Sequence, residues 1–296
     1  MPLQINRKYK LIIGDFHTLD ALEITDLQVT FDISKSSDNS QHSNSASIEI
    51  YNLSDKSLKI LETDYPAAVF YVGYEKESEV KLLFAGQVVG VTTRKNGTDR
   101  VTQLLMGVGY TELNHSSISK LVPAGKTVKD VVEELRKGFP NISRGIYNGS
   151  NLSSPLINGY SLSGTLKEEL DTLADSYKLE WRVDGDVLYV NDKDRAENEN
   201  FNSAYVISPS SGLIEIPYYT SGEKRRSKKD KAKKHGVQFS MLINPSVYAG
   251  QVVKLEDTDI HGWFKVDSVR YSGSWRGGNW LQEVKCSAIE KIIKSA

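Results

Sequence analysis

Four carboxylates close together on one predicted helix are the residues of this chain best suited to chemistry. They are Glu168, Glu169, Asp171 and Asp175. A glycosidase places two carboxyl groups across a cleft, where one acts as the acid and the other as base or nucleophile. Glu168 and Asp175 are seven residues apart, a spacing that puts both on one helical face. A solvated polar face explains this spacing without a cleft, so we predict no catalytic pair and no enzyme.

A run of basic residues in the last third of the chain is the sharpest local charge signal. It contains Lys224, Arg225, Arg226, Lys228, Lys229, Lys231, Lys233 and Lys234, against only Glu223 and Asp230. Clustered Lys and Arg bind phosphates, so the run is a candidate for contact with nucleic acid in a lumen. Single-strand binding would also need interleaved aromatic side chains, and the run has none. The alternative is a solvated loop between two strands, kept open by self-repulsion.

Metal, phosphate and cofactor sites find no support in the sequence. The histidines are His17, His42, His115, His235 and His261. None stands four residues from another, as a pair of zinc ligands on one helix would. Gly159 and Gly164 have phosphate-loop spacing, but Thr165 follows where the phosphate-binding lysine should stand. Asp192 and Asp194 begin like a calcium loop that the next residues do not continue. We therefore predict no metal and no cofactor.

The overall composition excludes several classes of protein. The formal net charge is -1, so no global field selects nucleic acid or an acidic membrane. A single cysteine, Cys286, rules out an intrachain disulfide framework. The first residues lack the apolar core of a signal peptide, and no apolar run is long enough to span a bilayer. We expect a protein made in a cytoplasm, without a membrane span.

The elements that must position these residues fall into three predicted regions. Residues 1–115 contain short strands with regular turn signals, such as the alternating run 27–33 and the Asn96-Gly97 turn, which are typical of a barrel or sandwich. A polar loop over 34–45 is long enough to project or to lie over a neighbour. Residues 116–202 mix helical and strand patterns, and residues 203–296 return to short strands.

The middle region has the clearest local signals. Thr165 and Glu168 form a capping box, and the helix that follows has one apolar face. That face consists of Leu166, Leu170, Leu173, Ala174 and Tyr177. Leu179, Trp181 and Val183 then alternate as in a strand, and the turn at Asp184-Gly185 would place Trp181 opposite Leu188 and Leu179 opposite Val190.

Two further signals frame this helix and hairpin. Thr127 caps an earlier helix, with Asp130 at the position usually held by Glu. A polar, charged connection over 191–202 leads to the third region. In that region an alternation at Ile214, Ile216 and Tyr218 predicts a strand, which Pro217 confines to an edge. The middle region is therefore a small α/β insert between two β regions.

Several segments together resemble a known family. They are 173–181 (LADSYKLEW) with its hairpin, 236–245 (GVQFSMLINP), 249–255 (AGQVVKL), 262–266 (GWFKV), Val269 and Trp280. In order and spacing they resemble the baseplate hub proteins of contractile-tailed phages, of the late control protein D type, over residues 25–290. The resemblance implies a mainly β fold with an α+β insert: two tube-like β-barrel domains, 1–115 and 203–296, plus a small α/β domain, 116–202.

The same resemblance implies a structural role in the virion. Three subunits would form a ring with pseudo-sixfold symmetry, which joins the sixfold tail tube to the threefold central spike. The expected partners are further copies of the chain in a homotrimer, the tail tube protein, the central spike protein and other baseplate proteins, with the tape measure protein as a further candidate. The alternatives are a cell-wall-acting or glycan-binding component of the same particle, and the spike base of a type VI secretion system.

Overall fold

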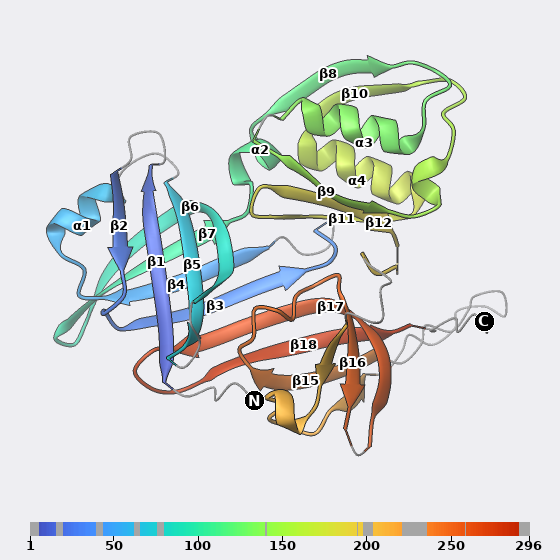
Figure 1. Ribbon diagram of the computed structural model, residues 1–296. Coiled ribbons are helices and arrows are strands. Elements are labelled where there is room, and N and C mark those ends of the chain that lie inside the picture. The colour runs from blue at the N-terminus through green and yellow to red at the C-terminus, as the bar shows by residue number, and fades with distance from the viewer. Residues whose placement is uncertain are drawn as a thin grey trace.

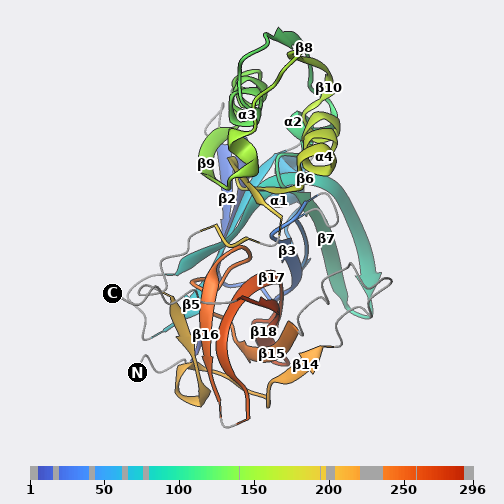
Figure 2. The ribbon, with the colours of Figure 1, turned by 90° about the vertical axis from the view of Figure 1, so that its right-hand side faces the viewer.

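The computed structural model of the chain describes residues 6–15, 20–39, 44–61, 66–75, 80–139, 141–193, 195–197, 204–220, 236–257 and 259–289. Strands dominate, which confirms the predicted mainly β fold. Figures 1 and 2 show two parts: a large β body, and a smaller insert that stands on one side of it.

The β body contains strands from both ends of the chain. The first region supplies β1 (Arg7–Asp15), β2 (Asp20–Ile24), β3 (Val29–Ser36), β4 (Ser45–Tyr51), α1 (Asp55–Ile60), β5 (Ala67–Tyr74), β6 (Lys81–Asn96) and β7 (Asp99–Gly107). The last region supplies β13 (Tyr205–Ile207), the 3-10 helix η3 (Pro209–Ser211), β14 (Tyr218–Thr220), β15 (Gly236–Leu242), β16 (Val252–Glu256), β17 (His261–Ser274) and β18 (Trp280–Ala288).

One long strand joins the two β regions into a single sheet. The order is β14-β15-β18-β17-β3-β4-β7-β6-β5-β1-β2. β17 pairs with β18 along one edge, while its other edge pairs first with β16 and then, over Ser268–Ser274, with β3. The sheet formed by the described strands ends at β14 and β2 without closing into a barrel. Both β regions of the sequence therefore share one hydrogen-bonded framework.

Aromatic packing reinforces this junction. Phe31 of β3 meets Phe70 and Trp280 edge-on, with ring centroids 5.0 and 5.2 Å apart. A Cβ at Gly273 would lie 2.5 Å from the Phe31 ring, so only glycine allows β17 to approach so closely. The Arg7 guanidinium donates to the carbonyl oxygen of Ser274 at 2.7 Å. The start of the chain thus holds the β17–β18 hairpin against the first region.

The insert combines helices with a two-stranded and a three-stranded sheet. It contains α2 (Tyr110–Asn114), β8 (Ser117–Val122), α3 (Val128–Lys137), β9 (Ser143–Asn148), the 3-10 helix η1 (Asn151–Ser153), β10 (Tyr160–Thr165), α4 (Leu166–Tyr177), β11 (Leu179–Asp184) and β12 (Val187–Asp192). The helices α3 and α4 lie between the β8–β10 ribbon and the sheet β11-β12-β9 (Figure 1). Both predicted capping boxes, at Thr127 and Thr165, are present.

Two local predictions are wrong. In the β11–β12 hairpin Gly185 and Asp186 form the turn, and Trp181 pairs with Val190 instead of Leu188. The reason is that Gly185, with φ 64°, takes the first central position of the turn. The shift is two residues, so each side chain keeps its predicted face. The other error is the strand predicted from Ile214, because β14 starts only at Tyr218, directly after Pro217.

Candidate functional site

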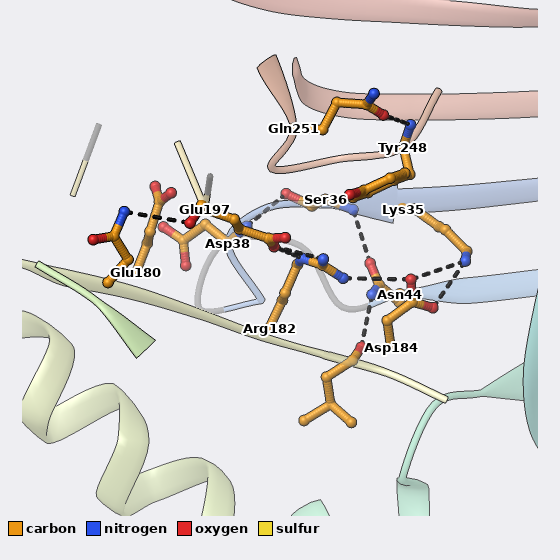
Figure 3. Close-up of polar contacts among 12 residues, drawn as sticks. Lys35, Ser36, Asp38, Asn44, Glu180, Arg182, Asp184, Glu197, Tyr248 and Gln251 are labelled. Atoms are coloured by element: carbon orange, nitrogen blue, oxygen red, sulfur yellow. Dashed lines mark hydrogen bonds and ion pairs between the residues drawn. The ribbon is translucent and has the colours of Figure 1, made fainter. Parts of the chain in front are cut away.

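The most unusual chemistry among the described residues lies where β11 of the insert meets the β body. In the sequence, Leu179, Trp181 and Val183 alternate with charged residues, which predicts one buried and one solvated face. In the structure Glu180 and Arg182 are buried as well. The apolar face lies toward α4, where the Trp181 indole Nε1 donates to Asp171 at 3.0 Å. The charged face lies against the β body (Figure 3).

A fully buried ion pair anchors one end of this charged face. Lys265 of β17 is 1% exposed, and its Nζ donates to the Glu180 carboxylate. Burial raises the pKa of Glu180 to about 7, because the charged form loses its hydration. The positive charge of Lys265 opposes this shift, and the nearby carboxylates of Asp38 and Asp267 add to it. The pair thus ties the insert to the strand that also joins the two β regions.

A chain of charges of alternating sign continues along β11. The Arg182 guanidinium donates to Glu197 at 2.7 Å and to Asp184 at 3.3 Å. Lys35 of β3 donates to Asp184 at 2.8 Å. Burial opposes the charge of Asp184, yet Lys35 and Arg182 together lower its pKa. Burial raises the pKa of Glu197, and Arg182 opposes that rise. Each charged side chain in this row along β11 therefore has a partner of opposite sign.

The edge of β11 is also covered by the body. The backbone N–H of Asn39 donates to the carbonyl oxygen of Trp181 at 2.7 Å. The side-chain amide of Asn44 donates to the carbonyl oxygen of Val183 at 2.8 Å, and its oxygen accepts from Ser36 N–H at 2.8 Å. Both asparagines belong to the predicted polar loop 34–45, and they hydrogen-bond to β11. They satisfy backbone groups that an edge strand would otherwise expose.

Glu197 is held in place by a glycine. Its backbone N–H donates to the carbonyl oxygen of Gly250 at 3.0 Å. Gly250 has φ 93°, and a Cβ there would lie 2.5 Å from the Glu197 carboxylate. Any other residue would be strained and would push Glu197 away from Arg182. Gly250 belongs to the 249–255 segment on which the family resemblance rests.

Glu168, Glu169 and Asp171 on α4 have structural partners, and Asp175 is exposed. Glu168 accepts from the N–H and hydroxyl of Thr165 at 2.9 and 3.0 Å. These hydrogen bonds lower its pKa, whereas a general acid working near neutral pH needs a raised one. Glu169 is buried and accepts from Ser163 N–H at 2.7 Å, so the prediction of a fully solvated face is wrong there. Glu168 thus caps the start of α4, and Glu169 anchors that start to β10.

The remaining predictions from the sequence concern the basic run, metal ligands and membrane spans. The basic run from Lys224 to Lys234 lies outside the described residues, and its role stays a prediction. The flanking residues Thr220 and Gly236 pair across β14 and β15. In the described part of the chain no three His, Cys, Asp or Glu side chains gather as metal ligands. None of the helices described there is both long and apolar enough to cross a membrane.

Sequence reasoning missed the residues of the buried cluster, Glu180, Arg182, Glu197 and Lys265. One signal was available in the sequence. Lys265 is preceded by Trp263 and Phe264 and followed by Val266, so it is a single charge within a short apolar run. A charge in such a run is solvated at an edge strand but needs a partner in a central one. The sequence does not show whether the strand that contains Lys265 is central or at an edge.

The described site is therefore a framework junction, with compensated charges and capped strand edges. A family model described as baseplate hub gp41 matches residues 15–260 of the chain. The chain belongs to this baseplate hub family. This confirms the resemblance found in the sequence. This family consists of structural phage tail components, which agrees with the prediction from the sequence that the chain carries no catalytic residues.

Solved structures share the fold of this hub protein. The tail protein from Neisseria meningitidis MC58 is 14% identical, with a TM-score of 0.63, and the match covers 94% of this chain and 96% of that one. The 43 kDa tail protein of prophage MuSo2 from Shewanella oneidensis is 10% identical, with a TM-score of 0.63 and coverages of 96% and 98%. The c3393 protein of E. coli, a type VI secretion component, is 10% identical, with a TM-score of 0.58 and coverages of 89% and 74%. No curated protein matches the chain.

The buried Glu180 of the hub protein predicts a pH-dependent stability. Its folded pKa of about 7 lies above its ordinary value of 4.5. The stability that this group contributes is therefore fully present below pH 4.5 and is lost as the pH rises through about 7. We expect this contribution to be about 3 kcal/mol in the free energy of unfolding, measured by urea denaturation between pH 4.5 and 8.

A matched pair of variants isolates this contribution. Glu180→Gln should flatten the dependence of stability on pH between 5 and 8, even though it lowers stability overall. Glu168→Gln is the control, because the pKa of that exposed carboxyl is lowered and its titration lies below this range. An unchanged slope in Glu180→Gln would contradict the assignment.

Proposed function

We propose that this hub protein is a structural subunit of a ring in the tail baseplate, which joins the sixfold tail tube to the threefold central spike. Membership of the baseplate hub family supports this proposal most directly. The architecture also suits it, since two β regions are fixed to one another through β17 and β3. Three copies would then offer paired β regions around one axis, which is the pseudo-sixfold arrangement that such an adaptor needs.

The free ends of the sheet are the surfaces that we assign to assembly. The strands β2 and β14 terminate the main sheet, and unpaired strand edges invite pairing with another chain. Exposed apolar side chains gather beside β14, where Ile216 is 73% and Tyr219 is 59% exposed. Pairing between copies would cover these edges, complete tube-like barrels between subunits and stop at a closed ring.

The proposed partners follow from this position. They are the tail tube protein, the central spike protein and other baseplate proteins, with the tape measure protein as a further candidate. The homotrimer would reside in the virion after synthesis in the host cytoplasm.

The ring predicts a defined mass and a defined interface. Native mass measurement and electron images of the purified protein should show trimers and rings, alone or with tube or spike protein. Replacing Ile216 and Tyr219 by Asp should weaken trimer formation at least tenfold, because two charges would be buried at the edge strand. Leu121→Asp is a matched control, since Leu121 is also exposed but lies on β8 of the insert.

Two outcomes would count against the proposal. The first is a monomer at high concentration that binds neither tube nor spike protein. The second is release of peptidoglycan fragments that Glu168→Gln abolishes, which would favour the cell-wall-acting alternative.

The basic run from Lys224 to Lys234 is proposed as a contact for nucleic acid in the lumen. Replacing its eight Lys and Arg residues by Gln should weaken binding of double-stranded DNA, and should reduce the salt slope by about one for each phosphate that the variant no longer binds. The control replaces Lys56 and Lys59 of the exposed helix α1. DNA binding that is equal in both variants would leave the run as a solvated loop.

A further inference from the structure

The contact between the insert and the β body differs in kind from the rest of the interior. We call it the ionic seam and define it as Lys35, Glu180, Arg182, Asp184, Glu197 and Lys265. On the insert side β11 presents charged side chains and backbone carbonyl groups to the body. The apolar side chains of the same strand are buried, and the strand contacts α4.

We propose that the insert is a separately moving part of the molecule, held to the β body by the ionic seam, which opens without unfolding either part. The proposal goes beyond the ring and does not depend on it. Its basis is that the hydrogen bonds and ion pairs that cross from β11 to the body join charged side chains, amides and backbone groups.

The energetics favour such an opening over local unfolding. Charges pay a large desolvation penalty when buried, so their hydration on opening offsets much of the attraction between them. Apolar surface has no such compensation, and its exposure costs about 25 cal/mol for each Å². Polar interfaces between domains of one chain accordingly permit relative motion, whereas large hydrophobic interfaces prevent it.

The chain connections are placed for a rocking motion. One enters the insert through Gly109, whose φ is 54° and whose Cβ would lie 3.6 Å from Val183 at one end of β11. The other leaves β12 at Asp192, which pairs with Leu179 at the opposite end of β11. Both connections thus flank the seam. Figure 1 shows the β11–β12 side of the insert turned toward the body, with α3, α4 and the β8–β10 ribbon farther away.

A hydrogen bond across the seam provides the test, with a neighbouring bond as its control. The N–H of Asn39 donates across the seam to Trp181 at 2.7 Å, whereas the N–H of Ser37 donates within the body to Asp267 at 2.8 Å. Native-state hydrogen exchange in increasing urea should give Asn39 a protection factor at least tenfold below that of Ser37. Its opening should depend little on urea, because little apolar surface is exposed.

A second variant makes the seam apolar. Glu180→Leu combined with Lys265→Met should slow exchange at Asn39 at least threefold and increase its urea dependence, since apolar contacts then hold the parts together. The proposal is overturned if Asn39 in the unmodified protein exchanges with the same protection and urea dependence as Ser37 and the β11–β12 ladder amides. In that case insert and body unfold as one unit.

Discussion

Replacing Lys265 with Met is expected to lower the free energy of unfolding by about 3–5 kcal/mol at pH 8. The Lys265 ammonium is the cationic partner of Glu180, and both side chains are buried. Without it, the carboxylate would be an unpaired charge in a site from which water is excluded, or it would have to take up a proton. Urea denaturation followed by tryptophan fluorescence measures the loss.

Two comparisons separate the effect of the missing ion pair from that of poorer packing. Lys285→Met on the neighbouring strand β18 removes an exposed lysine and should change stability by no more than about 0.5 kcal/mol. Adding Glu180→Leu to Lys265→Met should restore most of the stability, because an apolar pair can replace a buried ionic one. The loss should also shrink at pH 5.5, where Glu180 binds a proton. A loss that is equal at both pH values and is not restored would contradict the buried-pair explanation.

Arg182→Met is expected to have an effect of similar size, about 3–5 kcal/mol. The guanidinium joins Glu197 to Asp184 and lies over the Tyr189 ring, 4.0 Å from its centroid. Its removal leaves Glu197 buried without its cation, while Asp184 keeps Lys35. Thermal and urea denaturation should therefore show a large loss of stability. We attribute most of this loss to the unpaired carboxylate of Glu197.

Conservative variants test this explanation. Arg182→Lys keeps the charge but loses the planar fork, so we expect it to recover only part of the stability. Adding Glu197→Gln to Arg182→Met removes the buried charge and should recover more than adding Asp184→Asn. The opposite order would show that Asp184 is the group that depends on Arg182.

The sequence by itself determined the helix starts of the insert and the family. The capping boxes at Thr127 and Thr165 and the apolar face of α4 depend on residues within a few positions of one another. Such patterns are readable because a helix fixes its own spacing. The family resemblance likewise rests on short segments, whose order and spacing can be read directly along the chain.

Tertiary structure alone decided how the parts are joined. The pairing of β17 with β3 links residues more than two hundred positions apart, and no local pattern specifies such a partner. The same holds for Glu180 and Arg182, because alternation separates two faces of a strand but does not say what covers the polar one. In this protein that face meets Lys265 and Glu197 from other parts of the chain. The reason is physical: a charge can be buried only where its partner lies, and long-range folding brings the two together.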